Sequence, residues 1–132
     1  MAVAPLAVLP EARYGIVQPR SVVVVGDIVE CALALATHPD WRPGFTEVWD
    51  VRFAPAVEIR PADVPTLLDL ERRTKAELTG STTLIVTAKP LLLFSVRFYA
   101  HLMKPFGRRV VGAETEAEAA AFLGVPSLPT LT

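Results

Sequence analysis

The sequence predicts an α/β domain in which helices follow strands in alternation and cover a mostly parallel sheet. The chain has 132 residues, enough for one domain with a three-layer core. Hydrophobic residues make up 52% of the chain, a share that excludes global disorder. Segments with the two-residue period of strands alternate with segments that have the longer period of helices. This order is typical of crossover connections between parallel strands, and we expect one domain over 1–132.

Two short runs rich in β-forming residues, 13–18 and 21–25, predict the first two strands, as a hairpin or in sequence. The second run is apolar without alternation, which is typical of a strand covered on both faces. Asp27 follows at the position of a helix N-cap, and the apolar period predicts a helix that ends near Thr37. The preceding segment, 1–10, is expected to be loosely ordered.

The next predicted strand covers 46–53, where successive side chains alternate between two faces. Its apolar face is formed mainly by Trp49, Val51 and Phe53. A connection dense in turn residues precedes it, and we interpret its Trp41 as a lid on the edge of the core rather than as a binding residue.

The second half of the chain continues the alternation. It predicts a helix over 62–78, a strand over 82–87, a helix over 91–104, a strand over 108–111 and a helix from Thr115 to Gly124. The last helix begins with the spacing of a capping box, Thr115 and Glu118. The tail, 126–132, shows no period and is expected to be loosely held. The predicted order is β-β-α-β-α-β-α-β-α, with right-handed crossovers.

The helix over 91–104 is unusually apolar. One of its two overlapping stripes consists of Leu92, Val96, Tyr99 and Met103, and the other of Leu91, Phe94, Phe98 and Leu102. A helix that is apolar over so much of its circumference is covered by more than one neighbour. We expect the additional neighbour to be a second protein chain or a ligand.

Charge and composition exclude several classes of partner. The net charge is −1 and the basic residues are scattered, so we expect no nucleic-acid binding. The most apolar stretch, 83–100, is interrupted by Lys89, Pro90 and Arg97, and we expect no integral membrane segment. The single cysteine, Cys31, lies in an apolar helical stretch and favours a cytoplasmic location.

The motifs of common enzyme classes are missing from the sequence. No phosphate-binding glycine loop and no Gly-x-Ser-x-Gly sequence occurs. His38 and His101 are interpreted as solvated histidines, because no second ligand stands at metal-binding spacing. We expect no catalytic residue, metal or cofactor. An enzyme that uses Asp50 or Glu58 as an acid or base is the least favoured hypothesis.

The candidate polar site lies where the parallel strands end, because ligands of open parallel sheets lie beyond the carboxyl ends of their strands. Asp50 and Arg52 share one side of their strand there, and Lys89 follows the next strand. The pair either lines a polar pocket or is structural, with Asp50 capping a loop and Arg52 solvated. We favour the structural interpretation.

Several segments resemble the SpoIIAA-like superfamily, which includes STAS domains and lipid-binding CRAL-TRIO domains. They are the strand and helix start over 23–28, the loop over 38–44, the strand over 48–52 and the closing stretch over 114–123. The chain is most similar to the small stand-alone STAS-like proteins of bacteria, and the likeness in element order covers nearly its whole length.

In signalling STAS domains, a serine at a helix start is phosphorylated in an Asp-Ser-Ser-Gly motif. The corresponding stretch here, 58–61, reads Glu-Ile-Arg-Pro and has no hydroxyl group. The resemblance therefore implies a fold and partner binding, but no phosphoserine switch.

Two binding hypotheses follow. The first is a non-catalytic STAS-like regulatory module that forms a homodimer, or binds another protein, through the helix over 91–103. The second is a carrier of a small apolar molecule or lipid, held between this helix and the sheet by Phe94, Phe98, Tyr99 and Met103.

Overall fold

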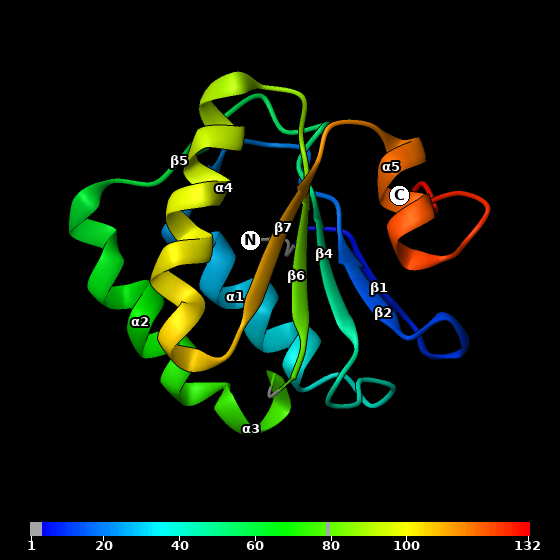
Figure 1. Ribbon diagram of the computed structural model, residues 1–132, viewed down its shortest axis with the longest axis horizontal. Coiled ribbons are helices and arrows are strands. Elements are labelled where there is room, and N and C mark those ends of the chain that lie inside the picture. Colours follow the sequence, from blue (N-terminus) through cyan, green and yellow to red (C-terminus); the bar gives the residue numbers. More distant parts are fainter. Residues whose placement is uncertain (1–3, 79) are drawn as a thin grey trace.

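The computed structural model describes residues 4–78 and 80–132, which form a five-stranded sheet with helices on both faces (Figure 1). The strands, in their spatial order, are β1 (Leu6–Leu9), β2 (Tyr14–Val17), β4 (Thr46–Asp50), β6 (Thr82–Val86) and β7 (Arg109–Ala113). Only β1 and β2 pair in antiparallel orientation, and the other neighbours are parallel. The predicted mostly parallel α/β architecture is confirmed.

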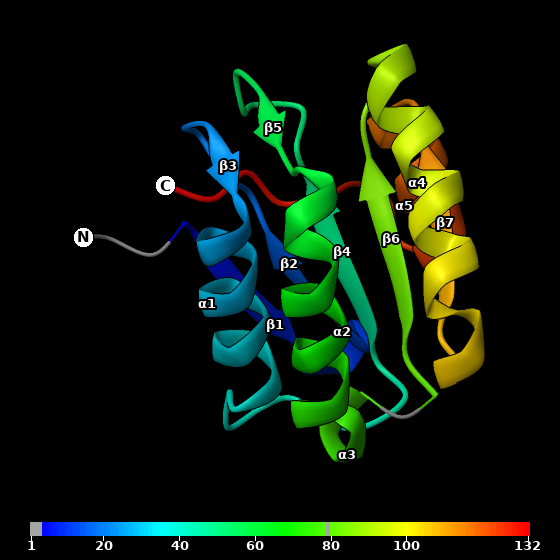
Figure 2. The same ribbon diagram turned by 90° about the vertical axis from the view of Figure 1, so that its left-hand side faces the viewer.

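Three helices cover one face of the sheet, and the last helix covers the other (Figures 1 and 2). The first face carries α1 (Val25–Ala36), α2 (Val64–Arg73) and α4 (Pro90–Met103), with the single turn α3 (Lys75–Leu78) following α2, and the second face carries α5 (Glu116–Leu123). Short 3-10 turns occupy Pro10–Ala12, Pro61–Asp63 and Lys104–Phe106. Within the described part of the chain, no helix is long and apolar enough to cross a membrane.

Strand β4 lies between the two halves of the core, and its alternating side chains serve both. Trp49 and Val51 pack with residues of α1 and α2, whereas Val48 is fully buried among residues of the α5 face. The predicted alternation between two faces is therefore confirmed, but the strand ends at Asp50 rather than at 53, and Phe53 is exposed instead of joining the apolar face. The helix predicted over 62–78 is divided at Thr74, whose buried hydroxyl donates to the Leu70 carbonyl oxygen at 2.8 Å.

The strand predicted over 13–18 is confirmed as β2, but the strand predicted over 21–25 is wrong as a member of the main sheet. The run 21–25 contributes only β3 (Val23–Val24), which pairs outside the main sheet with β5 (Val57–Glu58) before the chain turns into α1. The outer strand is instead β1, in the segment that we expected to be loosely ordered. Pro5 and Pro10 flank this strand rather than interrupt it, so the edge position tolerates both.

The C-terminal tail is also held more firmly than its composition predicts. Leu128 is buried against the α5 face of the sheet. The side-chain amide of Gln18 makes two hydrogen bonds to the backbone of the tail. Its Nε2 donates to the Pro129 carbonyl oxygen, and its Oε1 accepts from the Leu131 N–H, both at 2.7 Å. These hydrogen bonds supply the order that the apolar period lacks.

Trp41 packs with Ala36, Phe45 and Leu78, as predicted for a lid on the core. It is buried, its indole N–H donates to the Glu77 carbonyl oxygen at 2.9 Å, and its ring meets Phe45 edge-on. Gly15 allows this approach, because a Cβ at that position would lie 2.9 Å from Leu35 and 3.1 Å from Trp41. Trp41 is therefore part of the core.

Candidate functional site

A cavity of about 370 Å³ lies between the sheet and the helices of the α1, α2 and α4 face. Figure 2 shows α2 and α4 standing apart over β4 and β6. Most of the cavity wall is apolar, and its inner part includes Ile28, Ala32, Trp49, Leu67, Leu70, Ile85, Leu92 and Val96. These residues come from three helices and two strands, so the cavity is a product of the tertiary fold.

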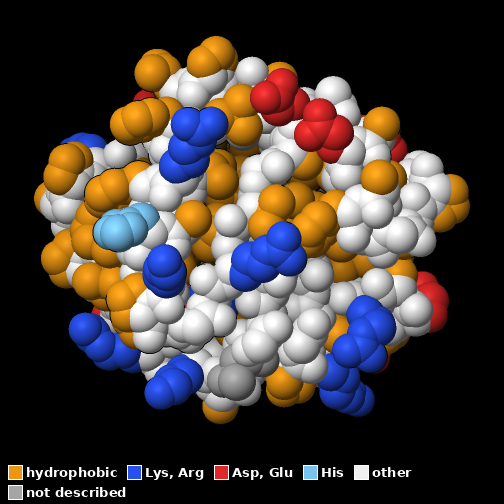
Figure 3. Space-filling model, viewed as in Figure 1, with side chains coloured by type: hydrophobic (Ala, Val, Ile, Leu, Met, Phe, Trp, Pro, Cys, Tyr) orange, Lys and Arg blue, Asp and Glu red, His pale blue; other side chains and the backbone are white. Residues whose placement is uncertain are grey.

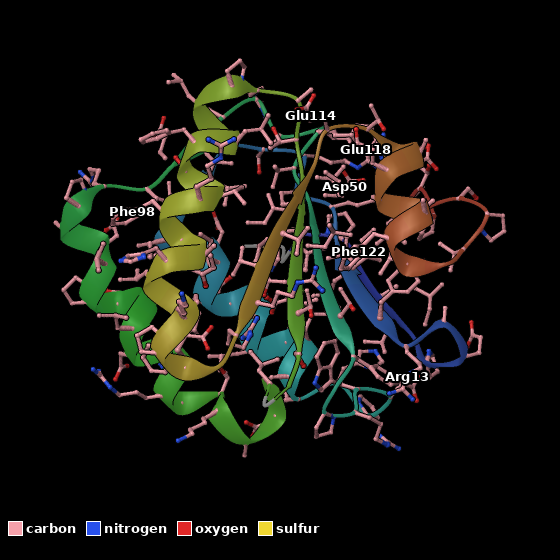
Figure 4. The ribbon with its side chains drawn as sticks, viewed as in Figure 1. Arg13, Asp50, Phe98, Glu114, Glu118 and Phe122 are labelled. Atoms are coloured by element: carbon pink, nitrogen blue, oxygen red, sulfur yellow. The ribbon has the colours of Figure 1, made fainter. Side chains whose placement is uncertain are left out.

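The cavity opens to solvent beside α4. Phe98 lines it and is 58% exposed, and Ile59 and Arg60, in the segment before α2, line it and are also exposed. Figure 4 shows Phe98 on the α4 side of the sheet. A cavity bounded by partly exposed side chains on both sides of its opening is accessible to a small molecule.

One part of the cavity wall is polar and carries Glu47, Glu71, Thr83 and Tyr99. Arg108 does not line the cavity but interacts with Glu47, Glu71 and Thr83. Its Nη1 donates to both carboxylate oxygens of Glu71, at 3.0 and 3.3 Å, and its Nη2 lies 3.5 Å from Glu47 Oε1. Nη2 also donates to the Thr83 hydroxyl, which donates in turn to Glu47 Oε1 at 3.1 Å. We call Arg108, Glu47, Glu71 and Thr83 the Arg108 cluster.

The Arg108 cluster holds two carboxylates against one guanidinium. The side chains of Arg108, Glu71 and Glu47 are only 3%, 6% and 7% exposed. Burial raises the pKa of Glu71, an effect that the positive charge of Arg108 opposes. Burial and the nearby carboxylates also raise the pKa of Tyr99, so its phenol stays protonated at neutral pH. The cavity therefore combines a large apolar wall with a small acidic region.

The four aromatic and sulfur-containing residues predicted to line a pocket have three different positions. Phe98 and Tyr99 line the cavity. Phe94 is 72% exposed and does not line it, and Met103 is fully buried in the core. The prediction was wrong for these two because the helix places them on its outer and inner sides.

The outer side of α4 bears the predicted excess of apolar surface. Leu91 is 84% exposed, and the exposed Phe94 and Phe98 follow it along the helix. Figure 3 shows hydrophobic side chains gathered on this part of the molecule. We call these three residues the outer stripe. The described chain does not cover it.

Asp50 and Arg52 form an ion pair, but on the opposite side of the sheet from the cavity (Figure 4). Arg52 Nε and Nη2 lie 2.8 Å from the two oxygens of the fully buried Asp50, which also accepts from Gln18 at 3.0 Å. Lys89 Nζ instead donates to the carbonyl oxygens of Pro55 and Ala54. Arg52 is therefore paired rather than solvated. The pair supports the Gln18 side chain that holds the tail.

The sequence interpretation missed the Arg108 cluster, although part of its signal was present. Glu47 alternates in phase with Trp49 and Val51, so a carboxylate occupies the apolar side of its strand. Glu71 follows the buried Leu70 on α2. The cation that compensates both lies 61 residues after Glu47, and no local pattern joins residues so far apart.

The sequence matches no family model and no curated protein. Among solved structures, the chain is similar to an uncharacterized protein of the DUF3478 family from Shewanella loihica PV-4, which has a SpoIIAA-like fold. The TM-score is 0.55, the identity is 13%, and 83% of each chain is covered. This likeness shows the fold alone. The SpoIIAA-like fold expected from the resemblance is thus confirmed.

Proposed function

We propose that this protein is a non-catalytic binding protein that holds a small, largely apolar molecule in the cavity between α2, α4 and the sheet. The observation that carries the proposal is the cavity itself. Its volume of about 370 Å³ lies within the range of small-molecule sites. Its apolar wall with a few polar groups is also typical of such sites, where the polar groups fix the orientation of the guest.

The energetics of the core also favour a guest. Protein interiors are packed as densely as organic crystals, and side chains beside an unfilled space lose dispersion contacts. An apolar guest restores these contacts for residues such as Leu67, Leu70 and Ile85, which form the wall. Glu71, Thr83 and one oxygen of Glu47 are engaged in the Arg108 cluster, and groups held in this way favour binding over catalysis. Arg108 engages Glu71 through both carboxylate oxygens.

A second candidate function is protein–protein interaction through the outer stripe, as a homodimer or with another protein. The observation that favours it is the exposure of Leu91, Phe94 and Phe98 on consecutive turns of α4. Interfaces are enriched in aromatic residues of this kind. The absence of a serine in the stretch 58–61 means that such a module would act without a phosphoserine switch at that position.

Phe98 and Phe94 separate the two functions, because both are exposed on α4 but only Phe98 lines the cavity. We expect the neutral fluorescent probe N-phenyl-1-naphthylamine to bind saturably, with one probe per chain. Phe98→Ser should weaken its affinity about fivefold through lost apolar contact, whereas Phe94→Ser should leave it unchanged. Fluorescence titration of both variants measures this.

The same two variants test the outer stripe by light scattering coupled to size exclusion. If the stripe forms a homodimer, the wild type is dimeric and both substitutions shift it toward the monomer. A monomeric wild type would contradict self-association. Probe binding that is lost equally in Phe94→Ser and Phe98→Ser would contradict the cavity and place the probe on the outer stripe.

A further inference from the structure

We infer that the molecule held in the cavity carries an amine, which is placed against Glu47 in the acidic region of the wall. This inference rests on the proposed function, since it names the chemical class of the guest. Two observations carry it: only one of the two Glu47 carboxylate oxygens has a hydrogen-bond partner, and the charges that line the cavity are mainly negative.

Glu47 has one carboxylate oxygen without a partner. Its Oε1 accepts from Thr83 and lies within reach of Arg108, whereas its Oε2 is buried and accepts no hydrogen bond from any described residue. The side chain is only 7% exposed, and Glu47 lines the cavity. A buried carboxylate oxygen without a donor is costly, and an N–H group of a guest would satisfy it.

The charges around the cavity favour a cation over an anion. Glu47 and Glu71 line it, but Arg108 does not, because the guanidinium lies behind them and is engaged with both. A guest in the acidic region therefore meets two carboxylates before it meets a positive charge. Arg60 also lines the cavity, but it is exposed at the opening, where solvent and salt screen its charge.

Tyr99 adds a neutral polar group to the same wall. It lines the cavity, and the negative charges of Glu47 and Glu71 act on it. Its protonated hydroxyl offers lone pairs to an ammonium group and does not add negative charge. The wall thus provides a charged acceptor and a neutral acceptor beside an apolar body, which suits an alkyl or aryl amine better than a fatty acid.

Three guests with the same apolar chain test this inference: octylamine, octanol and octanoate, each titrated to displace N-phenyl-1-naphthylamine from the wild type. We expect octylamine to bind about tenfold more tightly than octanoate, with octanol between them. Glu47→Gln should remove most of the preference for the amine and leave the affinity for octanol within about twofold. Glu58→Gln, which removes an exposed carboxylate near the opening, should preserve the ranking.

The outcomes separate this inference from the proposed function. Octanoate binding as tightly as octylamine would overturn the inference, while the displaced probe would still support an apolar site. Failure of the probe and all three guests to bind would overturn both. If Glu47→Gln does not fold, the ranking in the wild type decides. Tyr99→Phe then provides the second variant, which should weaken octylamine more than octanol.

Discussion

Arg108→Met is expected to lower the free energy of unfolding by about 3–5 kcal/mol, the usual cost of removing one partner from a buried ion pair. The substitution keeps an apolar side chain of similar length but leaves Glu47 and Glu71 buried without their shared cation. Urea unfolding measures the change as a lower midpoint with an unchanged slope. The neighbouring Arg109→Met removes an exposed guanidinium and should cost less than about 1 kcal/mol. Equal costs for the two variants would contradict the structural role of the Arg108 cluster.

The loss in free energy of unfolding caused by Arg108→Met, its stability deficit, should also depend on pH. The pKa of Glu71 in the folded protein already lies above its ordinary value of 4.5, and loss of Arg108 raises it further. A carboxyl with a raised folded pKa takes up a proton more readily when folded, so it destabilises the fold as the pH rises through that pKa. The deficit is therefore largest at neutral pH and shrinks as the pH falls toward 5. A deficit that stays constant from pH 7 to 5 would argue against buried carboxylates as its cause.

Asp50→Ala is the second substitution with a large expected effect, a loss of about 3 kcal/mol. It leaves Arg52 without its bidentate partner and removes one of the two acceptors of Gln18 Nε2, so that only the Pro129 carbonyl oxygen remains. Because Gln18 holds the tail, the Leu131 amide proton should exchange faster with solvent. Urea unfolding and hydrogen exchange measure the two effects.

Asp69→Ala is the matched control for Asp50→Ala. Asp69 pairs with Arg73 on the surface of α2 at 4.0 Å, and removal of such an exposed pair costs at most about 0.5 kcal/mol. If Asp50→Ala is no more destabilising than this control, or leaves the exchange of Leu131 unchanged, the Asp50–Gln18 contact does not anchor the tail.

The parts of the fold that the sequence predicts well are those with a strong local period. Strand β4 alternates over its whole length, and α4 is apolar around most of its circumference, so both were placed within a few residues. Strand β1 was missed because four residues between two prolines carry almost no periodic signal. It is stabilised by its antiparallel partner β2, a contact that the local sequence does not reveal.

The candidate site was predictable only in part. The excess apolar surface of α4 indicated a partner or a guest, and Phe98 and Tyr99 were identified as candidates. The cavity is lined by residues of α1, α2, α4, β4 and β6, and the packing of the whole fold determines how these elements stand to one another. The Arg108 cluster was not predicted, because Arg108 lies 37 residues from Glu71 and 61 from Glu47 in the sequence, too far apart for a local pattern to join them.

If the cavity is open space suited to a guest rather than a tightly packed core, two alanines of α1 reveal it most directly. Ala32 lines the cavity, whereas Ala36, one turn later, packs with Trp41, Phe45 and Leu78. They are 4% and 7% exposed. The measurement is a titration of N-phenyl-1-naphthylamine into Ala32→Leu and Ala36→Leu, with urea unfolding of each.

We expect Ala32→Leu to fold as stably as the wild type and to bind the probe at least fivefold more weakly, because the added side chain occupies the cavity. Ala36→Leu should retain probe binding but lose about 1–3 kcal/mol through overpacking. If Ala32→Leu is destabilised as much as Ala36→Leu, or binds the probe as the wild type does, the cavity is not the binding site.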